Sequence, residues 1–135
     1  MLQPRDQTAE SKQNEAEKYL KAMNQAQEEF FRKNKRFANS LEELERSANL
    51  IAQSYSYAYR LRVTEAEKAT ETSRSIITAS PREAGLKSYV SGVFVLPSGA
   101  TSIICETPKP SMEAPSAPQV IKKKLACAPR STKVQ

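Results

Sequence analysis

The sequence predicts an α+β domain in which a long N-terminal α-helix packs on a four-stranded antiparallel β-sheet. The first observation is the stretch from Thr8 to Asn34, whose apolar residues recur at three- and four-residue steps, as on one side of a helix. The second is a change of period to two residues between Ser54 and Thr64, as in a half-buried strand. The third is a series of further strand-like runs joined by short polar turns, which favours an antiparallel meander.

The long helix is expected from Thr8 to Asn34, and a basic turn up to Arg36 completes a helical spine over residues 8–36. One side needs a packing partner; it carries Ala16, Tyr19, Leu20, Met23, Ala26, Gln27, Phe30 and Phe31. The other side is expected to face water; it carries Glu10, Gln13, Glu17, Lys21, Gln25, Glu28 and Arg32. A coiled coil is the alternative, but the first side lacks the sustained leucine or isoleucine of a coiled coil. A helix lying across a sheet is therefore favoured.

A short second helix is predicted over residues 40–48. Ser40 is followed three positions later by Glu43, which matches the capping box, with Ser40 as N-cap and the glutamate reaching back. Leu41 and Leu44 are expected to hold this helix on the core.

Four strands are predicted, at about residues 54–64, 73–79, 86–96 and 101–106. Gly92, in the third strand, is expected to mark a bulge or a close approach to the helix. A proline-rich loop follows over residues 107–127, and residues 131–135 form a tail. The domain is therefore expected to cover residues 8–130, with residues 1–7 as a disordered or arbitrary start.

The core is expected between the helix and the inner face of the sheet. The predicted core residues are Tyr19, Met23, Ala26 and Phe30 from the helix and Tyr57, Tyr59, Leu61, Val93 and Val95 from the strands. With 135 residues, of which 39% are hydrophobic, the chain is large enough for one domain with a modest core. No run approaches the roughly 20 apolar residues of a membrane span, and no signal peptide is visible.

The net charge of +6 lies entirely in the second half of the chain. Residues 1–50 carry nine basic and nine acidic residues, whereas residues 51–135 carry twelve basic and six acidic residues. Such an excess of basic residues is typical of a protein that binds an anionic partner, which here would be DNA or a surface polysaccharide. The candidate contacts are Arg60, Arg62, Lys122, Lys123 and Lys124. No aromatic residue interleaves with the three lysines, which weakens the case for nucleic acid.

The chain has no histidine and only two cysteines, Cys105 and Cys127. The chain therefore lacks the residues that the usual Cys/His metal sites, Ser/His triads and Cys/His nucleophiles require. Neither catalysis nor a cofactor is expected. The two cysteines lie 22 positions apart with a proline-rich segment between them, which fits a disulfide that closes a loop. Two free thiols in a reducing compartment are the alternative.

Several segments occur together in a recognisable order. They are KYLKAMNQAQEEFFRKNKRFANSLEEL, the tyrosine-alternating SYSYAYRLRV, then LKSYVSGVFV, SIICE and the closing Cys127. In this combination the chain resembles the soluble part of type IV pilin-like proteins of the cyanobacterial G/H kind, over roughly residues 12–130. The resemblance implies a helical spine on a four-stranded antiparallel sheet, and a C-terminal loop closed by the two cysteines and exposed on the filament surface. It also implies a subunit and not an enzyme.

The resemblance implies a structural subunit, major or minor, of a type IV pilus that serves adhesion, motility or DNA uptake. Its partners would be other pilin subunits, contacted through a hydrophobic N-terminal segment, and the whole protein would be anchored in the inner membrane before assembly and displayed on the cell surface afterwards. The helix here starts hydrophilic at Thr8. Because residues 1–7 look like an arbitrary start and the cysteine pair suits an exported protein, we expect that this segment was removed and that the chain alone is monomeric. The alternatives are a pseudopilin of a type II secretion system and a soluble module that binds an anionic ligand through a basic face.

Overall fold

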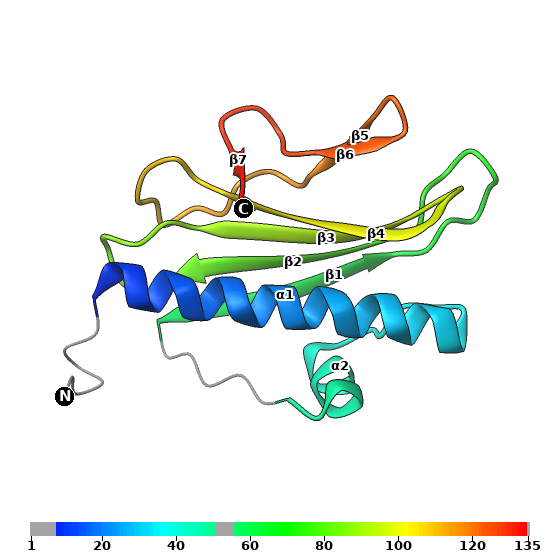
Figure 1. The fold of residues 1–135 in the computed structure, drawn as a ribbon, viewed down its shortest axis with the longest axis horizontal. Coiled ribbons are helices and arrows are strands. Elements are labelled where there is room, and N and C mark those ends of the chain that lie inside the picture. Colours follow the sequence, from blue (N-terminus) through cyan, green and yellow to red (C-terminus); the bar gives the residue numbers. More distant parts are fainter. Residues whose placement is uncertain (1–7, 51–55, 135) are drawn as a thin grey trace.

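The computed structural model describes residues 8–50 and 56–134. In chain order the elements are α1 (Ala9–Asn34), α2 (Leu41–Ala48), β1 (Tyr57–Thr64), β2 (Arg74–Pro81), β3 (Tyr89–Leu96), β4 (Gly99–Glu106), β5 (Gln119–Ile121), β6 (Lys124–Ala126) and β7 (Thr132–Lys133). Helix α1 lies along one face of an antiparallel sheet, and the segment containing β5 and β6 lies beyond β4 (Figure 1). The predicted fold class is confirmed.

The main sheet has the order β1-β2-β3-β4-β7, and every neighbouring pair is antiparallel. The four long strands are the expected meander, although β2 continues to Pro81 and β3 begins only at Tyr89. Residues 54 and 55 of the first predicted strand, residues 1–7 and residue 135 lie outside the described residues. Residues 131–135 were expected to form a tail beyond the domain. Instead, Thr132 and Lys133 belong to the main sheet, because they pair with Glu106 and Cys105.

The proline-rich segment differs from the predicted loop because it contains a β-hairpin. Strands β5 and β6 pair antiparallel, with Ile121 opposite Lys124. Lys122 and Lys123 form the two-residue turn and both have positive φ, at 51° and 67°. Turns of this kind usually use Asn-Gly or Asp-Gly, so the Lys-Lys pair gave no hairpin signal.

Both helices begin at hydroxyl caps. The Thr8 side chain accepts a hydrogen bond from Ser11 N at 3.0 Å, and Ser40 accepts one from Glu43 N at 3.0 Å. Glu43 also reaches back, but its Oε1 accepts from Asn39 N at 2.8 Å and not from the N-cap amide. This modified capping box fixes the turn between α1 and α2.

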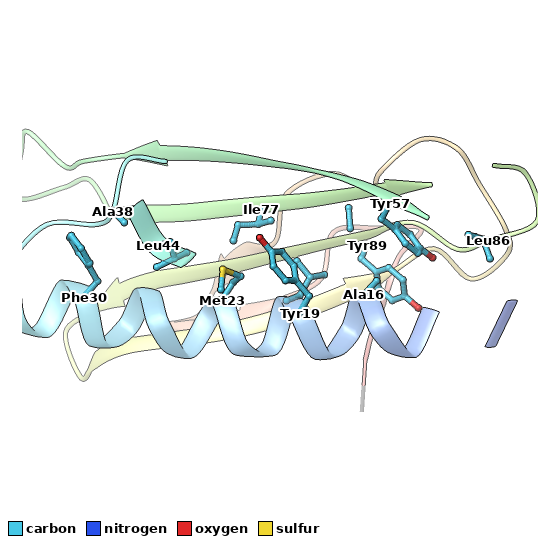
Figure 2. Packing of buried hydrophobic residues seen from close by; sticks show 12 residues of the cluster. Ala16, Tyr19, Met23, Phe30, Ala38, Leu44, Tyr57, Ile77, Leu86 and Tyr89 are labelled. Atoms are coloured by element: carbon cyan, nitrogen blue, oxygen red, sulfur yellow. The ribbon is translucent and has the colours of Figure 1, made fainter. Parts of the chain in front are cut away.

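The core lies between α1 and the sheet (Figure 2). Among the predicted core residues, Tyr19, Met23, Phe30, Tyr57 and Val93 are buried. Ala26, Tyr59 and Leu61 are partly buried and pack against the same cluster, and Val95 is partly exposed. Leu20, Leu44, Ile77 and Tyr89 complete much of its interior.

One flank of α1 that was expected to face water also contacts the sheet and the loop before β3. Gln13 accepts a hydrogen bond from Lys87 N at 3.0 Å, Glu17 from Tyr89 Oη at 2.8 Å, and Glu28 from Ser102 Oγ at 3.2 Å. The expectation was wrong at these three positions because a helix lying flat on a sheet contacts it along more than one row of side chains. Burial raises the pKa of Glu28 above its usual range, and its hydrogen bond from Ser102 opposes that rise.

The expectation for Gly92 was also wrong. The register from β2 through β3 to β4 runs unbroken past Gly92, so there is no bulge there. A Cβ atom at this position would lie 2.7 Å from Phe94 Cε1 and 3.0 Å from Ile76 Cδ1. Both side chains belong to a second apolar cluster, so the close approach lies within that cluster and not at the helix.

Candidate functional site

The sheet face opposite α1 carries the features that set this domain apart from a plain helix-on-sheet fold. Its second apolar cluster consists of Ile76, Val90, Phe94, Ile103 and Cys105, with Leu96, Leu125 and Cys127 packed against it. We call this face the outer face. Its β3–β4 side is covered by Leu125 of β6 and by Cys127, and its β1–β2 side carries charged side chains.

The predicted disulfide between Cys105 and Cys127 is confirmed, with a Cα–Cα distance of 5.7 Å. Cys105 lies on β4, opposite Val90, and its side chain is fully buried. Cys127 directly follows β6 and brings Leu125 onto the same cluster. The bond therefore fixes the C-terminal hairpin against the outer face and shields the apolar residues beneath it.

A groove runs along the β1–β2 side of the outer face, with a volume of about 530 Å³. Its basic residues are Arg60 and Arg62 of β1 and Arg74 of β2. Among its other lining residues are the hydroxyl residues Thr64, Thr78 and Ser80 and the apolar residues Ile76, Val90, Pro115 and Ala117. We call it the arginine groove; none of its lining residues is acidic. Its volume falls within the range of about 300–1,000 Å³ that is usual for ligand pockets.

The strand register explains why the three arginines share one face. Arg60 and Arg62 are two residues apart on β1, so their side chains point the same way. Arg74 pairs with Thr64, two residues beyond Arg62, and therefore points to that same face. Within the described residues, no ion pair or hydrogen bond engages these three guanidinium groups.

The five basic residues predicted as anion contacts do not form one surface. Arg60 and Arg62 lie on β1, at one edge of the main sheet. Lys122, Lys123 and Lys124 lie at the end of the β5–β6 hairpin, which packs toward β4, and none of them lines the arginine groove. Sequence reasoning missed Arg74, whose strand gave only a weak pattern. It also missed the wall formed by Pro115 and Ala117, because nothing local shows where a proline-rich segment lies.

The chemistry of this face comes from its basic side chains. In the part of the chain that the structure describes, no three residues of the metal-ligating types gather into a site. The arginine groove instead offers fixed positive charge, and guanidinium groups bind carboxylate, sulfate or phosphate through paired hydrogen bonds.

Comparison with known proteins decides the family. The family model described as Type IV pilin-like G and H matches residues 13–128, which is most of the chain. The chain belongs to this family. Comparisons of this chain with curated proteins and with solved structures found no match.

Membership gives this pilin-like domain a structural role and implies assembly with other pilin subunits. It also indicates a pilus or extracytoplasmic protein. The helix-on-sheet core is the scaffold, and the disulfide-bound hairpin and the arginine groove are its surface features. None of the helices described here is long and apolar enough to cross a bilayer.

Proposed function

We propose that this pilin-like chain is a structural subunit, major or minor, of a type IV pilus that serves adhesion, motility or DNA uptake. The observation that carries the proposal is the family match over residues 13–128. The long helix on an antiparallel sheet and the disulfide near the C-terminus support it, because both suit a rigid subunit that functions outside the cell.

In this proposal the sheet side of α1 holds the subunit together and the other side is available to neighbouring subunits. Lys18, Lys21 and Gln25 are exposed on α1, in keeping with a surface that meets polar groups. The protein would be anchored in the inner membrane before assembly and lie on the cell surface afterwards. Its disulfide-bound hairpin would then face the surroundings of the filament.

The test is to locate the protein in the organism that makes it. Filaments are sheared from intact cells, purified and probed with an antibody raised against residues 8–134, alongside the washed cell bodies. We expect the antibody to label the filaments, and deletion of the gene to remove that label. A second antibody against a cytoplasmic protein controls for lysis.

The same experiment separates the proposal from its closest rival. A pseudopilin of a type II secretion system would stay with the cell envelope and be absent from sheared filaments, and its deletion would block export of secreted proteins. That result would overturn the pilus assignment while leaving the family membership intact. Recovery of the protein only in the culture medium, apart from any filament, would favour a free-standing binding module.

A further inference from the structure

The arginine groove carries charge for which the described part of the chain provides no counterion. Arg60, Arg62 and Arg74 place three like charges on one face of two neighbouring strands, and like charges repel one another. The repulsion falls when an anion binds between them. We propose that the arginine groove is a binding site for an acidic polysaccharide, a chain that carries carboxylate or sulfate groups at regular intervals.

The spacing of the arginines favours a repeating anion over a single one. A strand rises by about 3.3 Å per residue, so Arg60 and Arg62 lie about 7 Å apart along β1. Arg74 pairs with Thr64, a further two residues along the same direction. The Cα atoms of the three arginines thus form a row that spans about 13 Å along the strands. A row of this length matches several charged groups along one extended chain, and each guanidinium can take up a carboxylate or sulfate with two hydrogen bonds.

The rest of the lining suits sugar rings. Thr64, Thr78 and Ser80 supply hydroxyl groups that can both donate hydrogen bonds to sugar hydroxyls and accept them. Pro115 and Ala117, which are not buried, give the C–H faces of a sugar ring an apolar surface to pack on. Charge, hydroxyl groups and apolar surface therefore occur together in one groove.

The same lining argues against nucleic acid. Proteins that bind single strands stack the bases on aromatic side chains, and none of the residues lining this groove is aromatic. A duplex would need phosphate contacts on an open basic surface, whereas Pro115 and Ala117 form part of this groove's wall. The three lysines that could have extended the basic surface lie on the hairpin instead. An acidic polysaccharide is thus the better match.

The test compares two polymers that differ only in charge. Binding of this chain to dextran sulfate and to neutral dextran is measured by calorimetry at one fixed ionic strength, with a DNA duplex as a third probe. We expect binding to dextran sulfate and none to neutral dextran. Each of Arg60→Gln, Arg62→Gln and Arg74→Gln should weaken binding by about tenfold, as loss of a charge-assisted hydrogen bond does, and the triple variant should show no binding.

The hairpin provides a matched control. The triple variant Lys122→Gln, Lys123→Gln, Lys124→Gln also removes three positive charges, but from a different surface. Its affinity for dextran sulfate should stay within about twofold of that of the unaltered protein. Equal loss of binding in the two triple variants would overturn the proposal, because binding would then follow net charge alone. So would dextran sulfate binding that survives in the arginine variant, or a DNA duplex that binds more tightly through the same arginines.

A second measurement does not depend on any variant folding. In the unaltered protein, dextran sulfate should shift the NMR resonances of the three guanidinium N–H groups and of Thr78, and leave those of Lys122 and Lys123 in place. Shifts confined to the hairpin would contradict the proposal. Because binding is measured on the isolated chain and not on filaments, its outcome does not depend on the pilus assignment.

Discussion

Gln27 is a fully buried polar residue of α1 that ties three segments together. Its Nε2 donates to Ala38 O at 3.1 Å and to Ser75 Oγ at 2.9 Å, and its Oε1 accepts from Ala38 N at 2.8 Å. The network joins α1 to the segment before α2 and to β2. Gln27 is polar, and it can lie on the packed side of the helix because both its amide nitrogen and its amide oxygen form hydrogen bonds there.

Replacing Gln27 by Ala should lower the free energy of unfolding by about 3 kcal/mol, because the two Ala38 backbone groups and the Ser75 hydroxyl lose their partner within the core. Urea unfolding followed by circular dichroism measures the change. Gln25→Ala is the matched control, since Gln25 is exposed on the same helix, and it should stay within about 0.5 kcal/mol of the unaltered protein. Equal midpoints for the two variants would contradict the burial of the network.

Three buried tyrosines should make the fold sensitive to alkali. Burial, followed by the nearby Glu45 carboxylate, raises the pKa of Tyr19, and burial followed by a hydrogen bond to Glu17 raises that of Tyr89. Burial also raises the pKa of Tyr57, whose hydroxyl donates to Lys87 O at 2.6 Å. A raised pKa means that the folded state holds the proton more tightly than the unfolded state. The resulting stability is complete below the usual tyrosine pKa of about 10 and is lost as the pH rises above it.

We therefore expect these three phenols to ionise only together with unfolding. The absorbance of tyrosinate and the circular dichroism are followed in parallel from neutral pH upward, and the rise of most of the tyrosinate signal should coincide with loss of the fold above about pH 10. A Tyr89→Phe variant removes one of the three groups and should make the loss of stability with pH less steep. Full ionisation of all tyrosines near pH 10 in a protein that stays folded would refute the expectation.

The packing of α1 on the sheet depends on a few large side chains. Phe30 is 8% exposed, lies in the main core cluster and has the Arg36 guanidinium 5.0 Å from its ring centroid. Phe30→Ala should cost about 3–5 kcal/mol, measured as a fall in the urea midpoint. Met112→Ala is the control, because Met112 is 51% exposed and its loss should change the midpoint little. A Phe30→Ala protein that unfolds like the control would mean that this side of α1 faces away from the core.

The disulfide should control the C-terminal hairpin more than the main sheet. It closes a loop across 22 positions, for which the chain-entropy model gives about 3 kcal/mol. Reduction should lower the urea midpoint and loosen β5 and β6, because Leu125 and Cys127 cover the second cluster through this bond. Intact-mass analysis with alkylating reagent, with and without reductant, checks the bond itself. Two thiols that react without reductant in properly exported protein would contradict it.

The elements differ in how far the sequence could predict them. Burial on one face imposes a period on the sequence, so the packed faces of the sheet and of the helix could be predicted. The inner face of the sheet follows from the alternation of Tyr57, Tyr59 and Leu61, and the packed side of α1 from the helical spacing of Tyr19 and Met23. Long-range pairing imposes no such period.

The two-residue strand β7 and the hairpin turned by Lys122 and Lys123 were therefore missed. The same limit applies to the arginine groove. The period-two pattern of β1 could place Arg60 and Arg62 on one face, but Arg74 joins them only through the register of β1 with β2.

For the whole molecule, we expect this chain to be monomeric in solution. Stable interfaces usually bury more than about 1,000 Å² and contain an apolar centre. In residues 8–50 and 56–134, the large hydrophobic side chains that are clearly exposed are Met112, Val120 and Ile121, and two of these lie on β5 beside three lysines. The excess positive charge of the second half of the chain also opposes association of two copies through that surface.

Sedimentation at high protein concentration tests this expectation, and the sedimentation coefficient should correspond to a single 15.0 kDa chain. If a stable oligomer forms instead, Ile121→Ser identifies its cause, because Ile121 is 48% exposed on a short strand whose hairpin could pair with a second copy. An oligomer abolished by Ile121→Ser would assign the contact to the hairpin. An oligomer that persists would mean that α1 or the outer face mediates association between separate chains, and it would favour a free-standing module over a subunit that needs further contacts to assemble.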